Sequence, residues 1–255
     1  MFRNEKGFHI LPVLLIIAVL GVVGFAGWQV ASKSKDKDAS NTSDQLANST
    51  GSEPDIALQN FGIASLDSVD VTTQATREFT SNKLKGFYIF GDSLSGGRIN
   101  PNFEFASLKT GTKLVAAIDG VIGFIKEQPD TKDSEVFLQP KDGSAWTIGY
   151  DHVVNVAVKK GDSVKAGAVL GEPAMQNNGL TRFEIQINKD EGGITTHYCP
   201  STLLAASVKD NLLAALGTMQ DNWEKTTGLE LYDLTAQNPA GCLKTAITPE
   251  QAEGR

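Results

Sequence analysis

Residues 158–167 read Val-Lys-Lys-Gly-Asp-Ser-Val-Lys-Ala-Gly, and this run indicates the fold class of the 255-residue chain. Gly161 and Gly167 flank its polar centre. Glycine readily takes the positive φ that tight connections between strands require. The run therefore predicts a turn that joins two short strands.

Short segments rich in β-branched and aromatic residues lie on both sides of this turn, separated by glycines and polar residues. Their length and turn-bounded spacing predict an antiparallel sandwich or barrel. We expect this β domain to occupy residues 86–200. The predicted strand segments are 86–90, 113–126, 135–138, 145–151, 153–158, 168–171 and 182–188.

A helix is expected after the strands, from about Ser201 to Lys225. Ser201 or Thr202 can cap it, and leucines recur behind them near helical spacing. We expect its apolar stripe to pack on the β domain within a helical extension at 201–247. Residues 248–255 are predicted to be a frayed tail.

The N-terminal part of the chain has a different composition. No charged residue occurs between Lys6 and Lys33, and residues 10–30 are strongly apolar. About 20 residues rising 1.5 Å each can cross a hydrocarbon core of about 30 Å. We therefore predict an uncleaved signal-anchor at 10–30 behind a cytoplasmic segment at 1–9, in preference to a cleaved signal peptide.

Two segments link the anchor to the β domain. Residues 31–54 are rich in Ser, Asp, Asn, Thr and Lys, with too few large apolar residues to fold, so they predict a flexible tether. Residues 55–85 contain apolar side chains that could pack on the domain, and their structure stays open. A further alternative starts from Lys6-Gly7-Phe8, which resembles a type IV prepilin cleavage site, although Pro12 replaces that family's glutamate.

Four segments between residues 111 and 187 occur in the order typical of one enzyme family. They are GTKLVAA at 111–117 followed by DGVI at 119–122, YDHV at 150–153, the glycine-flanked run at 158–167, and RFEI at 182–185. Together they resemble the lysostaphin or LytM-type zinc metallopeptidases, which cut peptide cross-links in bacterial cell walls. The resemblance implies a mainly β fold with a C-terminal helix, a duplicated hybrid motif β sandwich, here preceded by one transmembrane helix.

The resemblance also implies where a zinc site would lie. The family holds zinc with a histidine and an aspartate from an HxxxD motif and with the second histidine of an HxH motif, leaving room for water. In this chain HxxxD falls near Asn100 and Glu104, and HxH falls on Leu180 and Arg182. An arginine has no lone pair to give to zinc. We therefore expect no metal and no cofactor.

Only one of the chain's three histidines, His152, matches a functional histidine of the family. It is expected to be a remnant, so no catalytic residue is assigned. If the alignment holds, Glu104 and Arg182 project from neighbouring strands into the former metal groove, where an Arg-carboxylate pair could replace zinc. The groove candidates are Glu104, His152 and Arg182.

Two cysteines, Cys199 and Cys242, lie on the same side of the predicted anchor. An extracytoplasmic location favours a disulfide between them over two free thiols. Such a bond would tie the C-terminal extension to the β domain.

These features predict a binding protein of the cell envelope. A net charge of −7 argues against nucleic acid as a partner. The apolar segment predicts a single-pass cell-membrane protein, and the missing zinc ligands predict that its peptidase-like domain has lost catalysis. The resemblance implies that this domain is extracytoplasmic and binds cell-wall peptide or an envelope protein, as a regulator of wall hydrolases or a scaffold. Two alternatives stay open: an active zinc murein endopeptidase with an atypical ligand set, and an export adaptor or pilin-like assembly component.

Overall fold

The structure is a computed structural model that describes residues 56–71, 85–175 and 181–254. The predicted anchor, the tether and the prepilin-like site lie outside these residues. Within the three described ranges, no helix combines the length and the apolar character that crossing a membrane requires.

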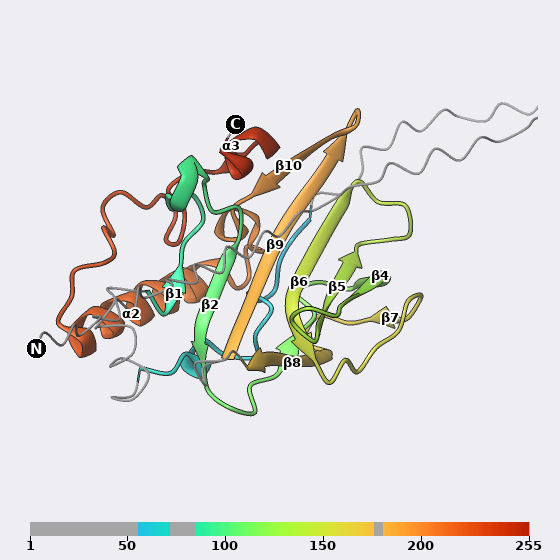
Figure 1. Ribbon diagram of the computed structural model, residues 1–255, viewed down its shortest axis with the longest axis horizontal. Coiled ribbons are helices and arrows are strands. Elements are labelled where there is room, and N and C mark those ends of the chain that lie inside the picture. The colour runs from blue at the N-terminus through green and yellow to red at the C-terminus, as the bar shows by residue number, and fades with distance from the viewer. Residues whose placement is uncertain (1–55, 72–84, 176–180, 255) are drawn as a thin grey trace, which may run out of the picture. The chain divides into compact units, whose positions relative to one another are not determined.

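The described residues form a connected antiparallel sheet of eleven strands (Figure 1). Eight strands follow one another by hydrogen bonding: β1 (Phe87–Tyr88), β2 (Phe103–Leu108), β9 (Thr181–Glu191), β8 (Val169–Met175), β6 (Trp146–Val154), β5 (Asp133–Gln139), β4 (Gly120–Gln128) and β7 (Ser163–Val164). β9 also pairs with β6. The remaining strands are β3 (Leu114–Val115) on β8, β10 (Ile194–Tyr198) on β9, and β11 (Ala246–Ile247) on β10.

The central strand β9 separates the two faces of the sheet by strict alternation. Phe183, Ile185 and Ile187 are fully buried, whereas Arg182 and Glu184 are half-buried on the opposite side. This period of two is what a strand with one core face requires. One face of β9 therefore belongs to the core and the other carries polar side chains.

An aromatic row fills the core beneath β1, β2, β9 and β6. The ring centroids of Phe87 and Phe105 lie 4.8 Å apart, and Phe183 lies 6.1 Å from both Phe105 and Tyr150. The Tyr150 hydroxyl accepts a hydrogen bond of 2.7 Å from the backbone N–H of Ala117. Side chains from four strands thus lock the polar face above them in place.

The long helix begins later than predicted. Residues Pro200–Leu203 form a short 3₁₀ helix, and α2 spans Lys209–Thr227. The physical reason is a long-range contact, because Leu204 forms a β-bridge with Leu58, whose N–H bonds the carbonyl of Leu203. The apolar stripe of α2 does pack inward through Leu216, Met219 and Trp223.

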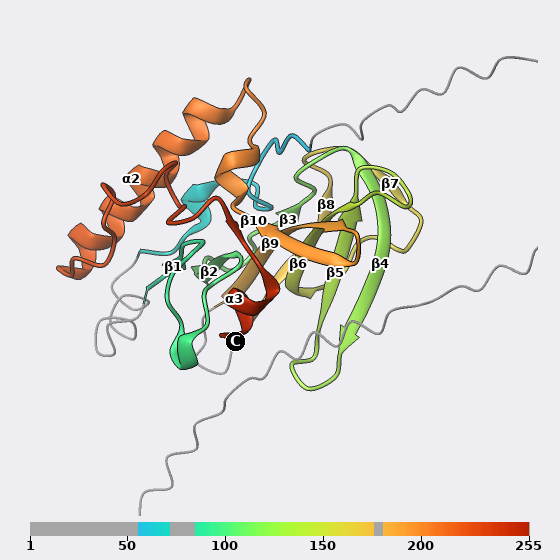
Figure 2. The same ribbon diagram turned by 90° about the horizontal axis from the view of Figure 1, so that it is seen from above.

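Two segments that were not predicted to be ordered elements, 55–85 and 248–255, contain packed or helical residues. Leu58, Phe61 and Ile63, from the segment left open by the sequence, are buried in the core. Where a frayed tail was expected, α3 spans Pro249–Glu253 and is capped by Thr248. Figure 2 shows α2 and α3 toward the β1–β2 end of the sheet, with β4 and β7 at the opposite end. The predicted class, mainly β with a C-terminal helix, is confirmed.

The predicted disulfide between Cys199 and Cys242 is present, with the two Cα atoms 6.0 Å apart. Cys199 directly follows β10, and Cys242 lies in the segment between α2 and β11. The same segment is hydrogen-bonded to the β1 region, since the N–H of Phe90 bonds the carbonyl of Gly241. The bond therefore ties the extension to the sheet.

Candidate functional site

Three neighbouring strands bring carboxylates together on the polar face of the sheet. Glu104 on β2 lies directly opposite Glu184 on β9, and Glu184 lies directly opposite Asp151 on β6. Like charges that face each other across strands are unfavourable. This row of acids therefore depends on positive charge supplied between them.

Arg182 supplies the first positive charge. It precedes Glu184 by two residues, so the two side chains share the polar face of β9. Its Nε lies 2.9 Å from Oε1 of Glu104, and its Nη2 donates a hydrogen bond to Oε1 of Glu184. The structure thus brings together Glu104 and Arg182, the two residues that the family alignment places on neighbouring strands.

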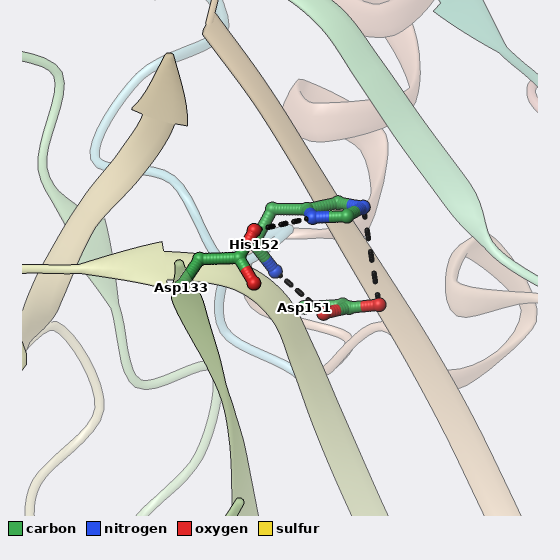
Figure 3. Close-up of side chains that lie close together, drawn as sticks. All are labelled: Asp133, Asp151 and His152. Carbon is green, nitrogen blue, oxygen red and sulfur yellow. Dashed lines mark hydrogen bonds and ion pairs between the residues drawn. The ribbon is translucent and has the colours of Figure 1, made fainter. Parts of the chain in front are cut away.

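His152 supplies the second charge (Figure 3). Its Nδ1 lies 2.8 Å from Oδ2 of Asp133, while its Nε2 lies 3.6 Å from Oε1 of Glu184 and 3.9 Å from Oδ2 of Asp151. His152 and Arg182 therefore both lie close to Glu184, which links the three groove candidates. The buried carboxylate of Asp133 holds one ring nitrogen of His152, and the other nitrogen points toward the row of acids.

An unusual backbone conformation makes this arrangement possible. His152 has a φ of 61°, a left-handed value that is uncommon for a residue with a side chain. Successive residues of a regular strand point to opposite faces. The left-handed φ lets adjacent Asp151 and His152 approach the same cluster, and the His152 N–H donates to Oδ1 of Asp151 over 2.7 Å. Such conformations are often found at functional sites.

The charges of the cluster follow from burial and from these neighbours. Burial alone would lower the pKa of His152, but Glu184 and Asp151 outweigh it and raise the pKa to about 9, so the ring is an imidazolium at neutral pH. Burial opposes ionisation of Glu184, yet His152 and Arg182 hold its pKa below the ordinary value. For Glu104, burial and the charge of Glu184 raise the pKa to about 7.

Zinc bound as in the resembling family does not fit these residues. Asn100, at the position of the first ligand, is 2% exposed and donates its amide to the backbone carbonyls of Ile89 and Asn102. Arg182, at the position of another ligand, has only donors. Of that set Glu104 alone offers a carboxylate, and it is already paired with Arg182. Leu180 lies outside the described residues.

A candidate metal cluster surrounds His152, where no metal was expected. Asp133, Asp151 and His152 each offer a ligand atom, and these atoms lie within 4.8 Å of one another. Oxygen and imidazole donors of this kind suit divalent cations. Hydrogen bonds from Thr131 and Gln128 also occupy oxygens of the two aspartates. The expectation of no metal therefore stays a prediction, and this cluster is the specific site at which to test it.

The sequence reasoning missed four members of the site: Asn102, Asp133, Asp151 and Glu184. Asp151 and Glu184 had a usable signal, because each lies inside a quoted family segment and Glu184 shares its strand face with Arg182. Asn102, which donates its amide to Glu184, and Asp133 had none. Both are far from His152 and Glu184 in the sequence, and they reach the cluster only when the sheet forms.

Comparison with known proteins agrees with the resemblance. Residues 104–198 match the profile described as peptidase family M23. No curated protein matches the sequence. Three of the similar solved structures are the NMR structure of lysostaphin, LytU, and the SpoIIQ–SpoIIIAH pore-forming complex.

The structural likenesses are distant and partial. The lysostaphin chain is 20% identical with a TM-score of 0.36, and the match covers 41% of this chain and 43% of that one. LytU is 22% identical with a TM-score of 0.35, covering 42% and 77%, and the complex is 18% identical with a TM-score of 0.35, covering 61% and 96%. The similarity to the M23 peptidase family therefore extends over residues 104–198, which are less than half of the chain.

Proposed function

We propose that this protein has lost the zinc hydrolysis of M23 peptidases and acts by binding a cell-wall peptide or an envelope protein. The observation that carries the proposal is the ion pair between Arg182 and Glu104, with Nε and Oε1 2.9 Å apart. A guanidinium at this place supplies charge without an open coordination position. Zinc hydrolysis needs that position for the attacking water and for the substrate carbonyl.

The same side chains support binding. A groove that keeps charged side chains and exposed strand edges can still hold an extended peptide. We propose that the domain regulates wall hydrolases or scaffolds envelope machinery by this means.

The proposed location is the outer side of the cell membrane, with residues 10–30 as a single-pass anchor. The disulfide between Cys199 and Cys242 supports this location, because disulfides persist in oxidising compartments. Residues 31–54 would then tether the domain close to the inner surface of the wall.

The test uses the full chain purified in detergent micelles. Metal content is measured by mass spectrometry, and purified peptidoglycan is offered both as a substrate and as a sedimentable ligand, with lysostaphin as the active control. We expect no stoichiometric zinc, no cleavage, and co-sedimentation with peptidoglycan or with envelope proteins. Stoichiometric zinc together with cleavage would contradict the proposal.

A second candidate function rests on the cluster of Asp133, Asp151 and His152, which favours a metal-dependent hydrolase with an atypical ligand set. If a divalent metal binds there, His152→Ala should abolish it and Arg182→Lys should leave it in place. If the metal were instead bound as in the family, changing Arg182 would alter it. Metal content of the two variants therefore separates this candidate from the leading proposal.

A further inference from the structure

The acidic row continues beyond the two cations, toward β5 and β4. Glu135 on β5 lies on the polar face next to Asp151. Among the described residues it forms one ion pair, with Lys126, the opposite residue on β4, at 3.5 Å. Lys126 is about half exposed, so this pair is weak. This end of the groove therefore carries more negative than positive charge.

Two carboxylate oxygens at this end of the row can accept hydrogen bonds from a ligand. Within the described part of the chain, no hydrogen bond reaches Oε1 of Glu135 or Oδ2 of Asp151, and the latter lies 3.9 Å from Nε2 of His152. Both side chains are partly exposed, so a ligand can reach them. A ligand that is rich in donors and positively charged would complement these two carboxylates.

The pKa values agree with this reading. Burial raises the pKa of Glu135, and the charge of Asp151 raises it further. Burial also raises the pKa of Asp151, with Glu184 adding to the rise and His152 opposing it. A bound cation would relieve the repulsion among these three acids.

An apolar surface adjoins the two open carboxylates. Phe137 follows Glu135 by two residues on the same strand face, about 7 Å along β5. Its ring contacts Phe124 with centroids 5.9 Å apart, and Phe124 is 51% exposed. Across the strand pair from Phe137 lies Gly149, which has no side chain to cover the rings.

We propose that Asp151 and Glu135 bind the ammonium group of a lysine-like side chain whose aliphatic stem lies on Phe137 and Phe124. An ammonium has three donors and no acceptor, which matches carboxylates from two neighbouring strands. A long methylene stem buries itself on apolar surface while its charged end stays at polar groups. The inference rests on the proposed binding function and names the chemistry of its ligand, an extended peptide that carries a primary amine.

The test compares two blocked, fluorescein-labelled tripeptides that differ only at the centre, one with lysine and one with norleucine. Binding to the full chain in detergent micelles is followed by fluorescence anisotropy. We expect the lysine peptide to bind about tenfold tighter, a difference of about 1.4 kcal/mol, and added salt to weaken it. Equal affinity of the two peptides, or no measurable binding of the lysine peptide, overturns the inference.

Near-isosteric variants locate the site. Glu135→Gln and Asp151→Asn should each weaken lysine binding several-fold and leave norleucine binding unchanged. Asp142→Asn is the matched control, because Asp142 is exposed in the β5–β6 loop and the variant makes the same change of charge. Circular dichroism and melting curves show that each variant is folded. An equal loss in Asp142→Asn would also overturn the inference.

Further outcomes distinguish this inference from a metal site and from the proposed function. If zinc binds with one-to-one stoichiometry and excludes the lysine peptide, the carboxylates are a metal site and the inference falls. If the chain sediments with peptidoglycan but does not distinguish lysine from norleucine, the inference falls while the proposed function stands. Zinc-dependent cleavage of peptidoglycan would instead remove the proposed function itself.

Discussion

The groove and the C-terminal extension are stabilised in opposite ways. In the groove, Glu104, Glu184 and Asp151 face one another and depend on Arg182 and His152 for compensation. The extension rests on apolar packing by α2, a disulfide, the Gly228 cap at the C-terminus of α2 and the capping box of α3. Each device in the extension favours folding, whereas the groove holds repelling charges and one left-handed backbone residue.

This contrast has a functional meaning. Sites that bind or react often break the local rules that the rest of a fold obeys, and the surrounding structure holds them in place. The aromatic core beneath β9 and the tie between extension and sheet provide such support here. The contrast predicts that charge changes in the groove and covalent changes in the extension affect stability differently.

Arg182→Ala should have the largest effect. It leaves Glu104 and Glu184 facing each other without their shared guanidinium, and breaking such a pair by removing one partner costs about 3–5 kcal/mol. The free energy of unfolding, measured by urea titration, should fall by this amount. Adding Glu104→Gln to the variant should recover part of the loss. A loss below about 1 kcal/mol, as for an exposed pair, would break the comparison.

Removing the disulfide tests the extension. Cys199 and Cys242 are 43 residues apart, and closing a loop of this size stabilises a fold by about 2–4 kcal/mol. The double variant Cys199→Ala with Cys242→Ala should lose that much at every pH, because no titrating group is involved. The wild-type protein in reducing agent is the control. A loss that depends strongly on pH would show that the extension and the groove are coupled.

Much of this architecture could be predicted from the sequence, and the failures have a common cause. The glycine-flanked run and the β-branched segments located most strands, and the alignment with the family placed Arg182 beside Glu104. β2, β10 and β11 were not predicted, since β2 alternates Phe with Glu over only a few residues, β10 is polar and β11 has two residues. Short strands of this kind are specified by their partners.

The site shows the same limit. Family segments pointed to His152, but nothing local links it to Asp133, which lies on a neighbouring strand. The start of α2 was misplaced for the same reason, because the leucines at 203 and 204 continue a helical pattern yet pair with the segment around Leu58. Local patterns therefore gave most of the elements and the family alignment gave one ion pair, whereas long-range pairing built the rest of the cluster.

The groove should also respond to pH through His152. Its folded pKa of about 9 lies above the ordinary value of 6.5, so its contribution is fully present below pH 6.5 and is lost as the pH rises through 9. The shift corresponds to at most about 3 kcal/mol at 1.36 kcal/mol per pKa unit. His152→Gln should therefore reduce the stability lost between pH 6 and pH 10. Identical pH profiles for the variant and the wild type would contradict this role.

The smallest predicted effect has the opposite sign. Glu135 lies on the groove face with Asp151, and burial together with that neighbour raises its pKa, so its charge opposes folding at neutral pH. Glu135→Gln should leave the free energy of unfolding unchanged or raise it by less than about 1 kcal/mol, while it weakens binding of the lysine peptide. Asp142→Asn should change neither quantity. A clear loss of stability in Glu135→Gln would mean that its pair with Lys126 supports the fold. The contacts at this end of the groove would then favour folding, as those of the extension do.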